Sequence, residues 1–109
     1  MGNQLSAYCA GVESGRTAYV TLSDFEMSSF SREFTIGYIV GHSNVQSLRF
    51  ACPDVAALTA GELGYRYGVS TDELLPALGF DEELTQVLLE TYENEHESSN
   101  DGGEGGWDS

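Results

Sequence analysis

The chain has 109 residues, enough for one domain with a modest hydrophobic core and too few for two. Its net charge of -14 comes from 18 acidic residues and four arginines, without lysine. This charge repels nucleic acid and anionic membranes and attracts cationic surfaces, so it excludes direct nucleic-acid or membrane binding and favours a basic partner.

The charge is unevenly distributed. Up to Pro53 the chain carries four acidic residues and three arginines, whereas the remainder carries 14 acidic residues and Arg66. Apolar runs are far shorter than the ~18 residues that span a bilayer, and the N-terminus lacks a basic segment followed by an apolar stretch. We therefore expect a soluble, cytoplasmic protein, in the host cytoplasm if it is viral.

The first part of the chain has the pattern of β-hairpins. Residues 5–12 and 16–22 are rich in β-branched and aromatic side chains and are linked by turn-forming residues 13–15. Apolar and polar residues alternate along the second segment, which is the period of a strand. These features predict a first hairpin.

A serine-rich stretch, residues 23–31, follows and contains Phe25, Met27 and Phe30. Two interpretations stay open. The stretch is either an interaction loop or a connection whose aromatic side chains pack back onto the sheet.

Residues 33–40 alternate more strongly, with one apolar face formed by Phe34, Ile36, Tyr38 and Val40. Residues 41–44 are turn formers, and residues 45–52 return as a strand that Pro53 closes. The sequence thus predicts a second hairpin. Cys9 and Cys52 would lie on these strands as buried free thiols, although a disulfide between them is left open.

Signals of helices appear after Pro53. Thr59 and Glu62 match a capping box at the start of a first short helix, and Gly68 is placed to end it. Ser70 and Glu73 repeat the box for a second short helix.

Gly79 ends this second helix, and Pro76 lies inside it, where it removes a backbone donor. A third helix over about 81–95 is predicted from apolar positions at spacings of three and four: Phe80, Leu84, Val87, Leu88 and Tyr92. Residues 98–109 lack apolar groups apart from Trp107 and are predicted to be a disordered acidic tail.

The segment YGVSTDELLPALG, residues 67–79, resembles the compact helical module at the N-terminus of bacterial translation initiation factors of the initiator-tRNA-binding type, and many DNA-binding turns. The resemblance implies a helix-turn-helix arrangement. A DNA-reading helix presents lysines and arginines, but this one presents Asp72 and Glu73. We therefore expect a helical corner packed on the sheet.

Residues that suit catalysis are few. His42 lies in the second predicted turn and His96 among glutamates, and neither has an evident nucleophile beside it. Motifs for phosphate loops or for metal ligands at regular spacing are missing from the sequence. We predict no enzymatic activity, no cofactor and no metal.

The predicted fold is a single α+β domain over residues 1–97: a four-stranded antiparallel sheet made of two hairpins, three short helices on one face, and the acidic tail 98–109. The predicted function is an acidic binding protein that docks on a basic protein surface. Its most specific form is a phage-type inhibitor, such as an anti-CRISPR or anti-restriction protein, that acts by mimicking nucleic acid or by occlusion. The predicted partner-binding residues are Asp72, Glu73, Glu82, Glu83, Glu90, Glu93, Glu97 and Trp107.

Two other functions are compatible with the same charge. One is a virion-assembly, chaperone-like or adaptor protein with a more apolar interface near Phe25 or Trp107. The other is adaptation to high salt, although the nearly neutral first half argues against it.

Overall fold

The protein is all-helical. The computed structural model describes residues 2–108, and it describes side chains for residues 5–97. Its helices are α1 (Gly2–Thr17), α2 (Asp24–Met27), α3 (Arg32–Phe50), α4 (Pro53–Tyr67), α5 (Thr71–Leu78) and α6 (Glu82–Asp108). The described residues contain no strand, so the predicted α+β class and its four-stranded sheet are wrong.

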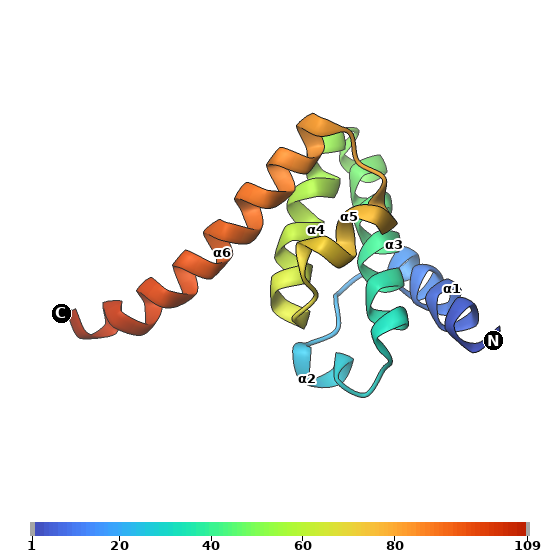
Figure 1. The fold of residues 1–109 in the computed structure, drawn as a ribbon, viewed down its shortest axis with the longest axis horizontal. Helices are drawn as coiled ribbons and strands as arrows, with labels where there is room; N and C mark the ends of the chain where they lie inside the picture. The colour runs from blue at the N-terminus through green and yellow to red at the C-terminus, as the bar shows by residue number, and fades with distance from the viewer. Residues whose placement is uncertain (1, 109) are drawn as a thin grey trace.

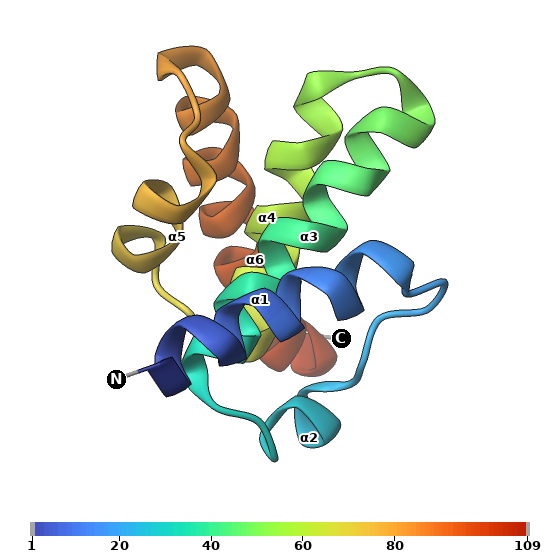
Figure 2. The same ribbon diagram turned by 90° about the vertical axis from the view of Figure 1, so that its right-hand side faces the viewer.

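The helices form a row in which each packs on the next. α1 packs on α3, α3 on α4, and α4 on α6, while α5 lies across the side of this row and contacts α3, α4 and α6 (Figure 1). Figure 2 shows α1 crossing in front of α3, with α2 below them. The distal half of α6 extends away from the other helices (Figure 1).

Glycines explain why residues 5–17 of the first predicted hairpin belong to helix α1. Residues 18–22, most of its second predicted strand, lie between α1 and α2 and are neither helix nor strand. A β-carbon at Gly15 of α1 would lie 2.2 Å from the carbonyl oxygen of Tyr38, and one at Gly37 of α3 would lie 2.2 Å from that of Tyr8. Gly11 and Gly41 make equivalent contacts, each four residues from its partner glycine. The two backbones therefore touch, which is possible because one face of each helix carries no side chain. Residues further along α1 contact residues further along α3, so the two helices run parallel.

The second predicted hairpin is wrong. Residues 33–50 lie in helix α3, which is covered on two sides. Every residue from Gly37 to Ser43 is buried, since α1 lies on one side of α3 and α4 on the other. A helix buried all round has no polar stripe, and its apolar residues then resemble strand alternation by chance. The predicted turn at residues 41–44 lies inside α3.

The ends of the later helices follow their local sequence. α4 begins at Pro53, which suits the first helical position, so the predicted capping box at Thr59 and Glu62 is wrong. Gly68 and Gly79 end α4 and α5 in the left-handed conformation, with φ of 73° and 65°. Both predicted stops are confirmed.

The start of α5 and the third predicted helix are also confirmed. The Glu73 carboxylate accepts the Ser70 backbone N–H at 3.1 Å, as the predicted box requires. The helix expected over 81–95 is the first part of α6. Pro76 lies within α5, as its position in the sequence implied.

The core lies between α3, α4, α5 and α6. Its buried members are Ile39, Ala57, Ala60, Leu63, Val69, Leu74 and Leu88. Small residues on α4 let its neighbours approach closely: a β-carbon at Gly61 would lie 2.8 Å from Cβ of Thr91 on α6. Close packing of this kind makes the centre of the molecule sensitive to added volume.

Two tyrosines fix the connection between α1 and α2. The Tyr38 hydroxyl accepts the Leu22 backbone N–H at 3.0 Å, and the Tyr67 hydroxyl donates to the Leu22 carbonyl at 2.5 Å. The two rings meet edge to face with centroids 6.2 Å apart. Burial raises the pKa of the Tyr67 hydroxyl, which keeps it protonated as a donor.

The segment 23–31 packs in part on α3, in place of the predicted sheet, while its role as an interaction loop stays a prediction. Met27 is buried and Phe30 stacks on Phe34 with centroids 4.2 Å apart, whereas Phe25 is 83% exposed. Both cysteines are free thiols, and Cys9 is exposed, so the expectation of two buried thiols is wrong.

Candidate partner-binding surface

Five of the predicted binding residues share one face of α6. Glu90, Glu93 and Glu97 recur at spacings of three and four, and Glu82 and Glu83 lie on the same side about two turns earlier. We call Glu82, Glu83, Glu90, Glu93 and Glu97 the acidic face. Leu88 is fully buried on the opposite side of the helix, so the acidic face points away from the core.

The acidic face is exposed and slightly hollowed. All five carboxylate side chains belong to exposed residues. Three of them, Glu90, Glu93 and Glu97, line an open depression of about 370 Å³ together with Asn94. The depression is a surface that a convex partner can cover.

Within residues 5–97, two of the four arginines pair with acids outside the acidic face, and Arg49 and Arg66 donate to Gln46 and Thr21. Arg16 pairs with Glu13 at 2.7 Å, and Arg32 pairs with Glu73 at 2.5 Å. These are the ion pairs of the described side chains, so no arginine among them neutralises the acidic face. Its charge is therefore directed at solvent or at a partner.

The two predicted residues on α5 lie apart from this face. The Glu73 carboxylate accepts hydrogen bonds from Nε and Nη2 of Arg32, at 2.5 and 2.7 Å. These bonds, followed by the Ser70 N–H, lower the pKa of Glu73 to about 2. Glu73 is thus an internal partner of α3. Asp72 is exposed in the first turn of α5.

Trp107 belongs to residues 98–109, whose side chains lie outside the described part of the structure. Its role as an anchor therefore stays a prediction. The domain boundary at residue 97 also stays a prediction, whereas the structure places residues 98–108, predicted as a disordered acidic tail, in the last part of helix α6.

The histidines serve as packing residues. His42 lies buried within α3, where its Nδ1 is 3.1 Å from the Gly15 carbonyl oxygen and its ring stacks on Tyr38. His96 on α6 meets the Tyr65 ring edge to face, with centroids 6.0 Å apart. In the described part of the chain, no group of three or more histidine, cysteine or acidic side chains is arranged to hold a metal ion.

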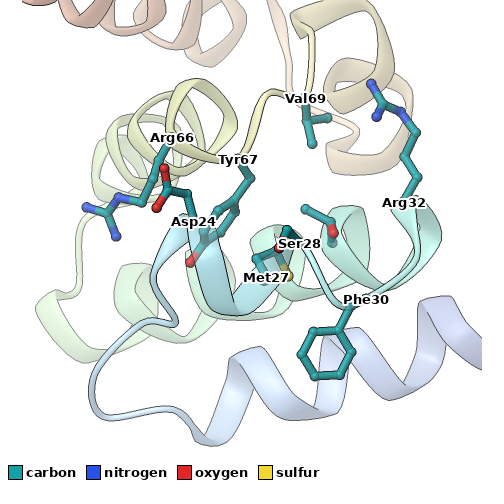
Figure 3. A pocket seen from close by; sticks show the side chains of 9 residues that line it. Asp24, Met27, Ser28, Phe30, Arg32, Arg66, Tyr67 and Val69 are labelled. Carbon is teal, nitrogen blue, oxygen red and sulfur yellow. The ribbon is translucent and has the colours of Figure 1, made fainter.

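A pocket of about 220 Å³ lies between α2, the start of α3 and the end of α4 (Figure 3). Arg66 and Arg32 lie at its two sides, and both are engaged elsewhere. Arg66 donates to Oγ1 of Thr21 at 2.9 Å, and Arg32 is turned toward Glu73. The pocket is formed by segments far apart in sequence, so its residues carry no local motif.

A second feature that the sequence did not predict lies beside the acidic face. Thr71 of α5 and Leu89, Tyr92, Glu93 and His96 of α6 line an open groove of about 530 Å³. Leu89 is 37% exposed there. Its position outside the core-facing stripe of α6 was the available signal, because a leucine off that stripe has no core to enter.

The fold and surface define an acidic, all-helical protein with an uncompensated anionic helix face. By sequence the chain belongs to the family described as "Protein of unknown function (DUF2623)", whose model matches residues 1–98. Neither a curated protein nor a solved structure matches the chain. None of the described helices combines the length and the apolar character that crossing a membrane requires.

Proposed function

We propose that this protein is a non-catalytic binding protein that docks on a cationic protein surface through the acidic face of α6. The observation that carries the proposal is the grouping of five exposed carboxylates on one side of a helix, with no arginine paired to them among the described residues. The overall charge of -14 supports it, because it draws cationic surfaces toward the molecule.

Such an interface depends on many charges acting together. One exposed ion pair contributes only about 0–1 kcal/mol, since water and salt screen it. In a row of carboxylates the free energies of the individual ion pairs add up. The row also accelerates diffusional encounter with a cationic partner. Binding by the acidic face should therefore weaken steeply with ionic strength.

The most specific form of the proposal is inhibition of a nucleic-acid-handling complex. Glu90 and Glu97 are separated by about 10 Å of helix at 1.5 Å per residue. That length of duplex carries roughly three phosphates per strand, at about 3.4 Å per charge. The three carboxylates over this span thus have a charge density similar to that of one DNA strand, which supports occupation of a groove built for nucleic acid.

An adaptor or assembly role is the second candidate. The observation that favours it is a set of apolar side chains that are strongly exposed away from α6: Tyr19, Val20, Phe25, Leu48 and Phe50. An interface using them would be apolar, and salt would affect it little.

The test compares neutralisation of three carboxylates on the acidic face with neutralisation of three exposed carboxylates on α1 and α4. The triple variant Glu90→Gln, Glu93→Gln, Glu97→Gln and the control Glu13→Gln, Asp54→Asn, Glu62→Gln change the net charge equally. Each is immobilised, incubated with cell lysate and eluted with a salt gradient. We expect the α6 variant to lose the partner that wild type retains, or to release it at markedly lower salt, while the control behaves like wild type.

Two results would contradict the proposal. One is equal loss in both variants, which would show that bulk charge alone matters. The other is a partner whose retention is insensitive to salt and to the α6 substitutions, which would favour the apolar adaptor role. Circular dichroism of each variant verifies that the helices are intact.

A further inference from the structure

The groove and the acidic face form two adjacent rows along α6. Leu89, Tyr92 and His96 recur at spacings of three and four and line the groove. Glu90, Glu93 and Glu97 recur at the same spacings, one residue later, and line the acidic depression. One residue corresponds to a rotation of about 100° about the helix axis, so the rows run side by side.

Glu93 belongs to both surfaces, since it lines the groove as well as the depression. The groove is bounded on its other side by Thr71, the first residue of α5. An apolar strip thus lies between the end of one helix and a row of carboxylates. The surface therefore offers apolar contacts beside anionic contacts, and the two helices hold their relative positions.

We propose that the segment of the partner recognised here is a cationic amphipathic helix. Its apolar side chains would cover Leu89, Tyr92 and His96, while lysines or arginines on its neighbouring face would reach Glu90, Glu93 and Glu97. This inference rests on the proposed function and adds the class of partner to it. In helix-in-groove recognition the incoming helix presents its anchors at spacings of three, four and seven. The two rows on α6 repeat at spacings of three and four, so they offer contacts in step with such a helix.

Charge decides between possible occupants of the groove. A second copy of this chain carries the same net charge of -14 and would bring like charges together at the acidic face. An acidic or neutral apolar peptide would gain the groove but leave the carboxylates without partners. A cationic amphipathic helix satisfies both rows, so charge complementarity selects it.

The length of the rows limits the size of the contact. Leu89 and His96 are separated by about 10 Å of helix. A partner helix therefore needs about two to three turns on this surface. That small area requires the apolar and ionic contacts to act together, since neither alone gives more than weak binding.

Two synthetic peptides of identical composition test the inference. Both have 18 residues of leucine and lysine. In one the order creates an apolar face, and in the other the leucines are distributed around the helix. Binding to the full chain is measured by fluorescence anisotropy at about 0.1 M salt. We expect the amphipathic peptide to bind at least tenfold more tightly than the scrambled peptide.

Variants of the groove locate the contact. Leu89→Ser should remove most of the difference between the two peptides, because it deletes the exposed apolar centre of the groove. Leu58→Ser is the matched control, since Leu58 on α4 is 45% exposed and Leu89 is 37% exposed. Thr71→Lys supplies a second variant that leaves α6 unchanged and should also weaken the amphipathic peptide by placing a cation at the rim of the groove.

The outcomes separate this inference from the proposed function. Equal affinities for the two peptides, or equal effects of Leu89→Ser and Leu58→Ser, would overturn the inference while leaving a purely ionic acidic face intact. Failure of both peptides to bind at low salt would overturn the proposed function together with the inference.

Discussion

Four glycines decide how α1 packs on α3 in the N-terminal half of the chain. Gly11 and Gly15 of α1 face Gly37 and Gly41 of α3, and each glycine lies against a backbone carbonyl of the other helix. Backbone cannot yield as a flexible side chain can, so these positions do not tolerate a methyl group. The same spacing of four residues in both helices is a sequence signal of this contact. In the predicted hairpins, Gly15 and Gly41 instead lie in turns and Gly11 and Gly37 in strands, and both assignments are wrong.

Replacing Gly37 with alanine tests this contact. Alanine in a helix ordinarily stabilises by about 0.5–1 kcal/mol relative to glycine. Here the added carbon would lie 2.2 Å from the Tyr8 carbonyl oxygen, so we expect a net loss of about 1–3 kcal/mol from overpacking. Urea denaturation followed by circular dichroism measures the change. Asn44→Ala, at an exposed position of α3, is the control and should leave stability unchanged or raise it. A stabilising Gly37→Ala would refute the close approach.

Between elements, one ion pair connects the start of α3 to the start of α5. Arg32 and Glu73 are 41 positions apart, and their two hydrogen bonds join helices whose other contacts are few. Glu73 also satisfies the Ser70 N–H, so one carboxylate both starts α5 and fastens it to α3. Local capping was predictable from the sequence, but the role of Arg32 was not.

The ion pair between Arg32 and Glu73 makes the stability of the fold depend on pH in a definite direction. Hydrogen bonds from Arg32 lower the pKa of Glu73 from 4.5 to about 2 in the folded protein. A depressed folded pKa means that the contribution to stability is present above pH 4.5 and is lost as the pH falls toward 2. We expect Glu73→Gln to lower the melting temperature by a few degrees at pH 7 and to have no effect near pH 2.

Thermal melts of wild type and Glu73→Gln between pH 2 and pH 7 provide the measurement. Glu62→Gln, at an exposed position of α4, is the control and should change stability little at any pH. A difference between wild type and Glu73→Gln that stays constant across this range would show that the ionised pair is not its cause.

At the scale of the whole molecule, net charge opposes folding. With a charge of -14, repulsion within the compact state exceeds that in the unfolded chain. The acidic face adds repulsion within α6, where Glu93 and Glu97 are four residues apart. Screening by salt should relieve both effects, since the Debye length is about 10 Å at 0.1 M.

We therefore expect the melting temperature to rise by a few degrees between about 10 mM and 0.5 M sodium chloride and then to level off. The Glu90→Gln, Glu93→Gln, Glu97→Gln variant should show a smaller rise. Thermal unfolding monitored by circular dichroism provides the test. A protein adapted to high salt would instead lose its fold below molar salt, and that result would revive the third interpretation of the charge.

The parts predicted from the sequence are those governed by neighbouring residues. Gly68 and Gly79 end helices because their backbone conformation costs other residues more, and Glu73 caps α5 from three residues away. The acidic face of α6 could be anticipated because helical spacing groups its glutamates. The groove at Leu89 could not, since it also needs Thr71 from another helix.

The N-terminal half depended on tertiary contacts. Residues 33–40 contain β-branched and aromatic side chains whose intrinsic preference for strands is weak, and packing on both sides of α3 overrides it. Local propensities amount to tenths of a kcal/mol per residue, whereas the close approach of α1 and burial against α4 act on the whole helix at once.

The sequence by itself determined the charge, its concentration after Pro53, and the starts and stops of α5, because these depend on composition or on residues within one helical turn. Tertiary structure decided that Gly11, Gly15, Gly37 and Gly41 join two helices and do not lie in the predicted strands and turns. It also decided that the Glu73 carboxylate is bound by Arg32 of α3 and that Thr71 of α5 lines the groove beside Leu89. These outcomes depend on contacts between residues far apart in the chain, and local pattern does not contain them.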